Sequence, residues 1–354
     1  MTKDIRLTQV MLASGDGGAE TFFEKLAIAF QQRGIRQVLV IQPHKAREQK
    51  LRDAGCDVRV VRLNGWRKHF SRWAIARIIR ETDSNIAMGW MSRGADAIPN
   101  IKGLAKLVRV GGYYKSKYFL RFDKVVVNAP QLIDHLVAGG VLREKTQLIP
   151  NFSDALPHSQ SDTQAIRQQF KISQHYFVAA SIGRLHQVKG HDLAIRVAVR
   201  IPWLYLLIAG EGSERTELTR LAESLGVADR VRFLGWHRKM GEVFSAADVI
   251  LFPTRSEPFG NVVVEAWREE VPIITSDIEG PAWLIDHEVN GLLCEKDNEA
   301  MFEAAVRKLK ESPKLAEQLI KNGRQKLDTS FSADCVVQAY QQLFQKLLDT
   351  QSKG

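Results

Sequence analysis

The stretch Asp248-Val-Ile-Leu-Phe-Pro-Thr-Arg-Ser-Glu257-Pro-Phe-Gly260-Asn-Val-Val-Val-Glu265-Ala decides the fold of this 354-residue chain. Its apolar run at 249–252 is short and is stopped by a proline, which is typical of a buried parallel strand. The Ser-Glu-Pro triplet at 256–258 then predicts the start of a helix. Proline is favoured at a first helical position, and an acidic residue suits the positive end of the helix dipole.

A helix that begins there would point its first backbone N–H groups at a ligand above the strand ends, a place that binds anions well. Gly260 would let the ligand come close, because it has no side chain. The N–H groups concerned are those of Phe259, Gly260 and Asn261. Glu257 and Glu265 are eight residues apart, so on one helix they would be separated by about 12 Å. That distance suits the two ends of one elongated ligand.

This Glu-Pro-Phe-Gly loop with a second glutamate eight positions on resembles the Glu-x7-Glu motif of the retaining glycosyltransferases of family 4, which have the two-domain GT-B fold. The resemblance implies that Glu257 contacts hydroxyl groups of a donor sugar and that Glu265 holds the ribose of its nucleotide. The alternative is an ordinary strand, turn and helix with acidic residues on its surface.

Composition indicates a globular protein of two domains, because 354 residues are long for one domain and 45% of them are hydrophobic. Three widely separated cysteines predict neither a disulfide framework nor a metal site, which fits a reducing cytosol. The first residues do not have the pattern of a signal peptide, and no apolar run approaches the roughly 20 residues that span a bilayer.

The net charge of +10 is unevenly shared along the chain. Residues 1–150 contain 26 Lys and Arg against 13 Asp and Glu, whereas the remainder contains 24 against 27. A first half at +13 beside a second half at −3 predicts that one domain faces an anionic surface or substrate. The alternative is a generally basic, solvated surface.

The second strong motif is Ser181-Ile-Gly183-Arg184-Leu-His-Gln-Val-Lys189-Gly190-His-Asp192. Gly183 relieves crowding just past a strand end, and two cations five residues apart flank a loop that can wrap a diphosphate. In the resembled family the matching Arg184 and Lys189 neutralise the donor pyrophosphate. The resemblance also makes donor-site residues of a glycine after the next strand and of two residues in the nucleotide-base region: Gly210, Trp236 and His237. Ordinary surface cations are the alternative for the Arg-Lys pair.

The N-terminal part begins with a strand, a glycine loop, a helix and a second strand, the βαβ unit of a doubly wound fold. A nicotinamide-dinucleotide fingerprint is disfavoured, because the G-x-G-x-x-G spacing and an acidic residue after the second strand are missing. The resemblance places Gly17 and Gly18 near the donor phosphates and the acceptor, and a tight turn without a ligand is the alternative. Expected strands are 7–13, 38–41, 58–63, 86–90, 106–110, 124–128, 177–182, 204–209, 231–234, 249–252 and 272–275.

Two basic stretches rich in aromatic residues lie in the first domain. If 66–80 is helical, its isoleucines pack on the sheet and leave aromatic side chains among Arg and Lys, the composition of an interfacial membrane helix. Buried or subunit contacts are the alternative. Family members often carry a histidine after the strand at 106–110, and here that place reads Val110-Gly-Gly-Tyr-Tyr. The predicted acceptor or membrane residues are Trp66, Arg67, Lys68, Arg72, Trp73, Tyr113, Tyr114 and Lys115.

We therefore expect an α/β protein of the GT-B fold, with two Rossmann-like doubly wound domains. The expected division is an acceptor domain at 1–150, a nucleotide-sugar domain at 151–330, and a C-terminal helix at 331–354 that returns to the first domain. The remaining histidines show no metal-ligand pairing, so neither a metal nor a cofactor other than the UDP- or GDP-linked donor is expected.

The expected function is metal-independent, retaining glycosyl transfer, of hexosyltransferase type, to a saccharide acceptor that is lipid-linked or part of the lipopolysaccharide core. The expected catalytic residues are Glu257, Arg184 and Lys189, and the expected location is the cytoplasmic side of an anionic inner membrane. A soluble acceptor, a nucleotide-sugar epimerase or phosphorolytic enzyme of the same fold, and a basic nucleic-acid-binding protein are the alternatives.

Overall fold

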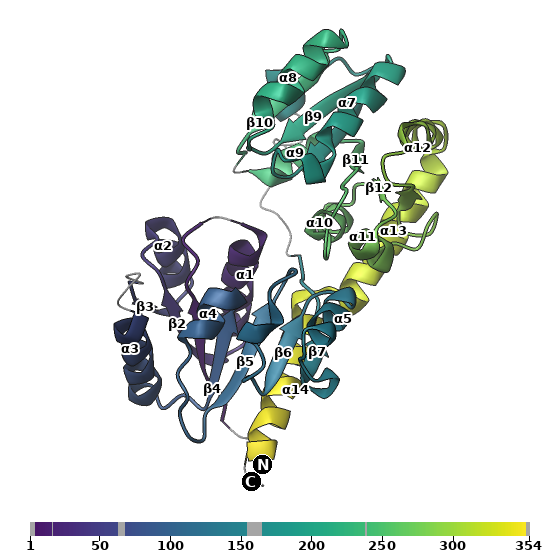
Figure 1. Ribbon diagram of the computed structural model, residues 1–354. Coiled ribbons are helices and arrows are strands. Elements are labelled where there is room, and N and C mark those ends of the chain that lie inside the picture. Colours follow the sequence, from purple (N-terminus) through teal and green to yellow (C-terminus); the bar gives the residue numbers. More distant parts are fainter. Residues whose placement is uncertain (1–3, 16, 63–67, 154–164, 238, 352–354) are drawn as a thin grey trace. The chain divides into compact units, whose positions relative to one another are not determined.

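The computed structural model describes residues 4–15, 17–62, 68–153, 165–237 and 239–351. The chain folds into two compact units, each with its own parallel sheet (Figure 1). The first unit combines residues 1–151 with 333–354, and the second comprises residues 152–332. Each unit is described by itself below.

The sheet of the first unit has the strand order β3-β2-β1-β4-β5-β6-β7, and every pair in it is parallel. Its central strands β1 and β4 are buried along almost their whole length. The sequence of β4 is apolar throughout, whereas β1 buries Gln9, whose amide is paired with Gln37 and Trp90. The strands are β1 (Arg6–Met11), β2 (Arg36–Ile41), β3 (Asp57–Val60), β4 (Ile86–Trp90), β5 (Ala105–Val110), β6 (Lys124–Val127) and β7 (Thr146–Leu148).

Parallel neighbouring strands need crossover connections, and helices form most of them. They are α1 (Gly18–Gln32), α2 (Lys45–Asp53), α3 (Lys68–Glu81), α4 (Met91–Ala97) and α5 (Gln131–Ala138), with short 3-10 turns η2 (Ser116–Tyr118) and η3 (Arg143–Lys145). The last helix, α14 (Ala333–Gln351, yellow in Figure 1), also belongs to this unit. Phe30 of α1 contacts Tyr340 and Phe344 of α14 at ring-centroid distances of 5.4 and 5.9 Å. The end of the chain is therefore part of the first unit's core.

The sheet of the second unit has the order β10-β9-β8-β11-β12-β13 and is also parallel. Alternate residues of β8 face two separate cores, with Ala179 in one cluster and Val178 and Ala180 in the other. The strands are β8 (Phe177–Ile182), β9 (Leu204–Ala209), β10 (Val231–Gly235), β11 (Val249–Phe252), β12 (Ile273–Ser276) and β13 (Leu292–Cys294). The described helices are α6 (Ala165–Gln169), α7 (His191–Arg200), α8 (Arg215–Ser224), α9 (Met240–Ala246), α10 (Asn261–Arg268), α11 (Glu279–Leu284), α12 (Glu299–Glu311) and α13 (Pro313–Ser330), with the 3-10 turn η5 (Gln187–Lys189).

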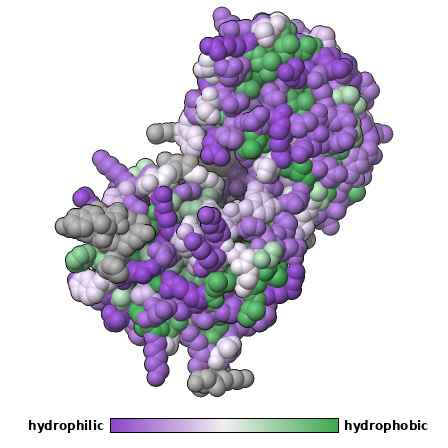
Figure 2. Space-filling view, in the orientation of Figure 1, coloured by the Kyte–Doolittle hydropathy of each residue, from purple (hydrophilic) through white to green (hydrophobic). Residues whose placement is uncertain are grey.

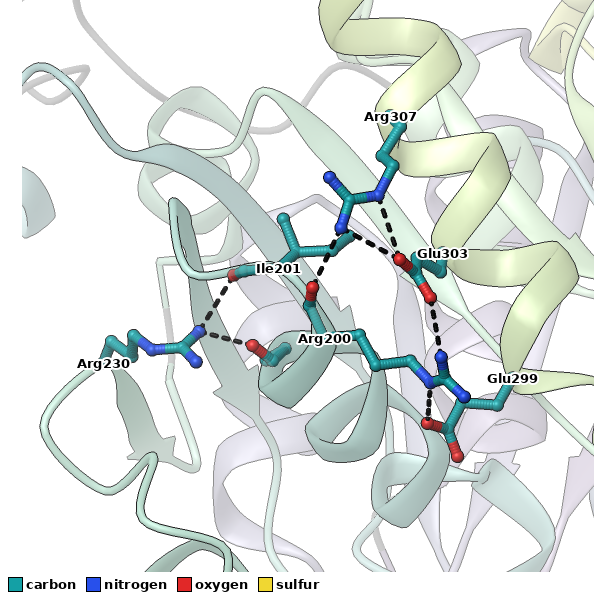
Figure 3. Close-up of polar contacts among 7 residues, drawn as sticks. Arg200, Ile201, Arg230, Glu299, Glu303 and Arg307 are labelled. Carbon is teal, nitrogen blue, oxygen red and sulfur yellow. Dashed lines mark hydrogen bonds and ion pairs between the residues drawn. The ribbon is translucent and has the colours of Figure 1, made fainter.

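Two arginines hold the C-terminal end of α7 (Figure 3). Arg307 donates to the carbonyl oxygen of Arg200 at 2.9 Å and to Glu303 at 3.0 Å, and Arg230 donates to the carbonyl oxygen of Ile201 at 3.1 Å. Cations at this end complement the helix dipole and satisfy carbonyl groups that the helix leaves open. The opposite end of α7 begins directly after the loop that carries Lys189.

Candidate active site

The site begins with the contact between Lys189 and Glu257. Strands β8 and β11 are neighbours, so the loops that leave their carboxyl ends lie next to each other. The ammonium group of Lys189 forms an ion pair with Oε2 of Glu257, and the two side chains are 19% and 15% exposed. The same ammonium lies 5.5 Å from the ring centroid of Phe252. Two predicted catalytic residues, 68 positions apart in the sequence, thus form one half-buried pair.

Arg184 lies in the loop between β8 and η5 and has an exposed side chain. Within the described residues its guanidinium forms neither a hydrogen bond nor an ion pair. The loop therefore presents one cation without a carboxylate partner and a second, Lys189, whose partner a diphosphate can replace. This is the charge arrangement that a phosphate ligand needs.

The glycines of the neighbouring loops permit close backbone packing. A Cβ atom on Gly210, which has a φ of +147°, would lie 1.9 Å from the carbonyl oxygen of Gly183. The N–H of Gly210 also donates to the carbonyl of Gly235 at 2.9 Å. The loops after β8, β9 and β10 are thus locked together, so both Gly183 and Gly210 serve the packing that shapes the predicted donor site.

The predicted helix start at 256–258 is wrong, since α10 begins at Asn261. The preceding loop is tied to the lysine turn, where the hydroxyl of Thr254 and the N–H of Arg255 donate to the carbonyl of Val188 at 3.0 and 2.7 Å. Gly260 then adopts a left-handed φ of +98° as the N-cap residue. Glu257 therefore lies in the loop, and the helical spacing of about 12 Å between it and Glu265 does not apply.

The other predicted residues of this stretch differ in what their side chains can do. Phe259 is 2% exposed and packs 6.0 Å from Trp283 and 6.2 Å from Phe331, so its predicted contact with a donor can come only from its backbone. Asn261 and Glu265 are half-buried and lie one turn apart on the same face of α10.

Trp236 and His237 follow the end of β10. Trp236 is 66% exposed, so its ring is accessible for stacking. His237 Nε2 lies 3.0 Å from Oε2 of Glu242. The carboxylate of Glu242 also accepts a bond from Lys239 at 2.9 Å, and these contacts, the one with Lys239 foremost, lower the pKa of Glu242.

Strand order brings the predicted donor residues of this unit to one edge of the sheet. The loops of four consecutive strands carry them, in the order β10, β9, β8 and β11. Neighbouring strands lie about 4.8 Å apart, so these four ends span about 14 Å. One elongated ligand can therefore meet all four loops.

Two residues of this edge were not predicted from the sequence. His191 is buried, its Nδ1 lies 2.9 Å from the hydroxyl of Ser181, and its Nε2 has no hydrogen-bond partner within the described residues. Burial lowers the pKa of His191 to about 4, so the ring is neutral at pH 7. Arg255 is the second, and its partners Asp192 and Asp297 are too distant in the sequence to give a signal.

The glycine loop of the first unit follows β1. Gly17 is the extended N-cap residue of α1 and Gly18 is its first residue, so the second of these glycines is already helical. Arg47 holds the loop by donating to the carbonyl oxygens of Ala13 and Gly15 at 3.0 and 2.7 Å. The donor or acceptor role of Gly17 and Gly18 remains a prediction.

The basic and aromatic side chains of the first unit are partly exposed. The predicted residues Trp66 and Arg67 lie outside the described residues, and Lys68 is the first residue of α3. Phe70 and Trp73 of that helix are 71% and 61% exposed, while its isoleucines 75, 78 and 79 are buried, as predicted. Figure 2 shows hydrophobic patches among hydrophilic side chains on the visible face of this unit.

The remaining predicted surface residues differ in their surroundings. Tyr113 is 48% exposed and Lys115 is exposed, whereas Tyr114 is half-buried and burial raises its pKa. Arg72 donates to the backbone oxygen and the carboxylate of Asp96 at 3.0 and 2.8 Å, so part of its charge is neutralised within the protein.

Within the described ranges no helix is long and apolar enough to cross a membrane. In the same part of the chain, no group of three or more His, Cys, Asp or Glu side chains is arranged to hold a metal ion.

Comparisons with known proteins agree with this architecture. Residues 162–326 match the family described as glycosyl transferases group 1. The chain is 31% identical over 343 residues to the lipopolysaccharide core biosynthesis glycosyltransferase LpsE of Rhizobium meliloti (strain 1021), covering 93% of this chain and 96% of that protein.

Solved structures show the same fold. A glycosyltransferase from Rickettsia africae ESF-5 superposes with a TM-score of 0.87 at 15% identity, covering 98% of this chain and 99% of the other. HepE from Anabaena, solved in complex with UDP, gives a TM-score of 0.82 at 19% identity, covering 97% and 99%. The predicted GT-B fold, with two Rossmann-like sheets, is confirmed.

Proposed function

The chain belongs to the group 1 glycosyltransferases, and from this premise we propose that it transfers a hexosyl group with retention and without a metal ion. Its donor is a nucleotide sugar. The observation that supports the mechanism is the pair of Lys189 and Glu257 at the ends of adjacent strands. Placed there, a cation can meet the departing diphosphate, and a carboxylate can meet the sugar hydroxyls.

The donor diphosphate lies between Arg184 and Lys189 in this proposal. As it binds, it replaces Glu257 as the partner of the Lys189 ammonium. The freed carboxylate then accepts hydrogen bonds from the sugar and orients it. Trp236 and Glu265 contact the nucleoside, the former by stacking on the base and the latter through the ribose.

In the transfer step the bond between the sugar's anomeric carbon and the phosphate oxygen breaks, and its electron pair stays on the diphosphate. The acceptor hydroxyl attacks the anomeric carbon from the same face and gives its proton to the departing phosphate. Lys189 and Arg184 stabilise the negative charge that develops there, a task for which preorganised cations are effective. Glu257 orients the sugar and does not act as a nucleophile.

A donor screen tests this assignment. The purified protein is incubated with lipopolysaccharide core and a panel of nucleotide sugars, beginning with UDP-glucose, and release of the nucleoside diphosphate is measured. UDP sugars come first because HepE was solved with UDP. We expect release with one donor to depend on the acceptor. Stimulation by inorganic phosphate in place of the acceptor, or no release with any donor, would overturn the proposal.

The acceptor in this proposal is a lipid-linked saccharide, the lipopolysaccharide core, reached from the cytoplasmic side of the inner membrane. Three observations support it: the charge of +13 in residues 1–150, the exposed rings of Phe70 and Trp73, and the name of the relative LpsE. Each basic residue near an anionic membrane adds about 1 kcal/mol of attraction, and inserted aromatic rings add apolar burial.

Sedimentation with vesicles tests the membrane part. The protein should pellet with phosphatidylglycerol vesicles at low salt and stay in solution with phosphatidylcholine vesicles. The double variant Phe70→Ser/Trp73→Ser should lose much of this binding. Val289→Ser/Met301→Ser is the matched control, because it removes two exposed apolar side chains from the second unit. Equal binding to both vesicle types, or none, would favour a soluble acceptor.

A further inference from the structure

Arg255 connects the two loops that carry Lys189 and Glu257. Its guanidinium donates two parallel hydrogen bonds of 2.8 Å to the carboxylate of Asp192. The same group donates to the carbonyl oxygen of Gln187 at 2.7 Å. Its Nε also donates to the carboxylate of Asp297 at 2.6 Å, so the guanidinium donates four hydrogen bonds in all. A single side chain thus spans the turn before Lys189, the first turn of α7 and a third loop.

The backbone of Arg255 makes the same connection. Its N–H donates to the carbonyl of Val188, the residue before Lys189, at 2.7 Å. Gly190, directly after Lys189, has a φ of +68°, and a Cβ there would lie 2.0 Å from the carbonyl oxygen of Pro253. The lysine turn is therefore held on both sides of Lys189 by the loop that leads to Glu257.

We propose that Arg255 is a positioning residue for the transfer reaction, which sets the distance and direction between the Lys189 ammonium and the Glu257 carboxylate. This inference rests on the proposed function of those two residues. The ammonium group of Lys189 ends a flexible side chain of four methylene groups. Its position is therefore only as well defined as the backbone turn that carries Lys189. A displacement of about 1 Å at a reacting centre costs about a hundredfold in rate.

The charge of Arg255 is already neutralised within the protein, so we assign it to positioning Lys189 and Glu257 and not to binding the diphosphate. Its side chain is 24% exposed, and two carboxylates already pair with it. Burial alone would raise the pKa of Asp192, yet the hydrogen bonds and charge of Arg255 hold that pKa below its ordinary value. The pair thus stays ionised at neutral pH. Arg184 differs, since it is exposed and unpaired within the described part of the chain.

The test uses Arg255→Gln, Arg255→Lys and a matched control. Arg307→Gln is that control, because Arg307 also pairs with a carboxylate and a backbone carbonyl, but at the other end of α7 (Figure 3). We expect Arg255→Gln to lower kcat about 10- to 100-fold while the donor KM changes less than about threefold. Arg255→Lys should recover only part of kcat, because an ammonium cannot form the bidentate fork. Arg307→Gln should keep kcat.

A double-mutant cycle separates positioning from general stabilisation. If Arg255 acts through Lys189, Arg255→Gln should cost less than about threefold in the Lys189→Ala background, since there is no ammonium left to place. Equal costs in both backgrounds, or an unchanged kcat in Arg255→Gln, would overturn the inference. If Arg255→Gln does not fold, Asp192→Asn takes its place in the same cycle, because it removes the charge that holds the fork.

The outcome for Lys189→Ala distinguishes this inference from the proposed function. If Lys189→Ala itself turns over like the wild type, the donor-site assignment fails and the inference fails with it. If Lys189→Ala is impaired and Arg255→Gln is not, the proposed function stands and only the positioning role is overturned.

Discussion

Arg47 in the first unit and Arg255 in the second both fasten the loop that follows the first strand of their sheet, but they do so in different ways. Arg47 is 1% exposed, shares Glu24 with Lys50 and donates directly to carbonyl oxygens of its glycine loop. Arg255 is 24% exposed and holds its loop from a neighbouring strand end.

The difference between these two loops indicates which of them can bind a phosphate. The first part of the chain has the larger positive charge, yet its loop arginine is buried with a carboxylate and serves the fold. The second part has a net charge of −3. Its loop nevertheless presents Arg184, which has no partner among the residues that the structure describes, and Lys189, whose partner can be replaced. The site that we assign to the diphosphate is thus identified by how exposed each cation is and by whether a carboxylate pairs with it, more than by the number of cations.

The largest effect we expect is on stability, in Arg47→Met. This change leaves Glu24 with only its second partner, Lys50, and breaking such a buried pair costs about 3–5 kcal/mol. Lys50→Met is the matched control. It removes the other partner of Glu24 from a side chain that is 51% exposed, so its cost should stay below about 1 kcal/mol. Hydrogen exchange of the segment around α1 and the glycine loop is the measurement. Equal losses in both variants would show that burial does not distinguish the two cations.

The next effect is catalytic. Lys189→Ala and Glu257→Ala should each lower the transfer rate about 10²–10³-fold with the fold intact, since each removes a preorganised group. Lys308→Ala is the control, because Lys308 forms an exposed pair with Glu288 in the same unit. Release of nucleoside diphosphate and circular dichroism are measured. If both site variants retain most of their activity, the lysine loop of the second unit is not the catalytic site.

A third prediction concerns His191, which lies below the lysine loop. Its pKa of about 4 is lower than the value of about 6.5 in an unfolded chain, so the unfolded state takes up the proton first as pH falls. The contribution of neutral His191 to the free energy of unfolding should therefore have its full value above pH 6.5. It should decrease by up to about 3 kcal/mol as the pH falls to 4. Denaturant titrations across this range, with His191→Gln beside the wild type, measure the effect. A variant whose stability falls as steeply as that of the wild type would contradict it.

The smallest expected effect is that of chelation. If Arg184 and Lys189 stabilise the departing diphosphate, an excess of EDTA should leave the transfer rate unchanged within about twofold. Added Mn²⁺ should not restore activity to Lys189→Ala. A rate that depends on Mn²⁺ would assign the phosphate charge to a metal ion and remove the proposed role of the loop cations.

The sequence alone predicts eleven of the thirteen strands found in the described residues, mostly because a strand buried on both faces tends to be a continuous apolar run. It misses β7 and β13, which are only three residues long and give too short a pattern to recognise. The Gly-Arg-x4-Lys-Gly and Glu-x7-Glu motifs likewise select residues that the fold places at one sheet edge. The helix start after β11 could not be predicted in the same way. Pro258 suits a first helical turn, but hydrogen bonds from Thr254 and Arg255 to Val188 tie this loop to the lysine turn, and the helix begins only at Asn261.

The role that we assign to Arg255 was equally out of reach from the sequence. A single arginine in a loop has no pattern, and its carboxylate partners stand 63 and 42 positions away. The pairings of β8 with β11, of β11 with β12 and of β12 with β13 bring these segments together. Local motifs therefore identify the residues that would meet a ligand, whereas the residue that spaces them depends on the tertiary fold.

The strand order also bears on how such a protein can be altered. Trp236 follows Gly235, the last residue of the edge strand β10, whereas Lys189 and Glu257 follow interior strands whose loops are interlocked through Gly190 and Pro253. If Gly235, which accepts a hydrogen bond from Gly210, is kept, a loop beyond the edge strand can be replaced with less effect on its neighbours than an interior loop. We therefore expect nucleobase preference to be exchangeable by grafting the segment after β10, while the centre of the sheet tolerates little redesign.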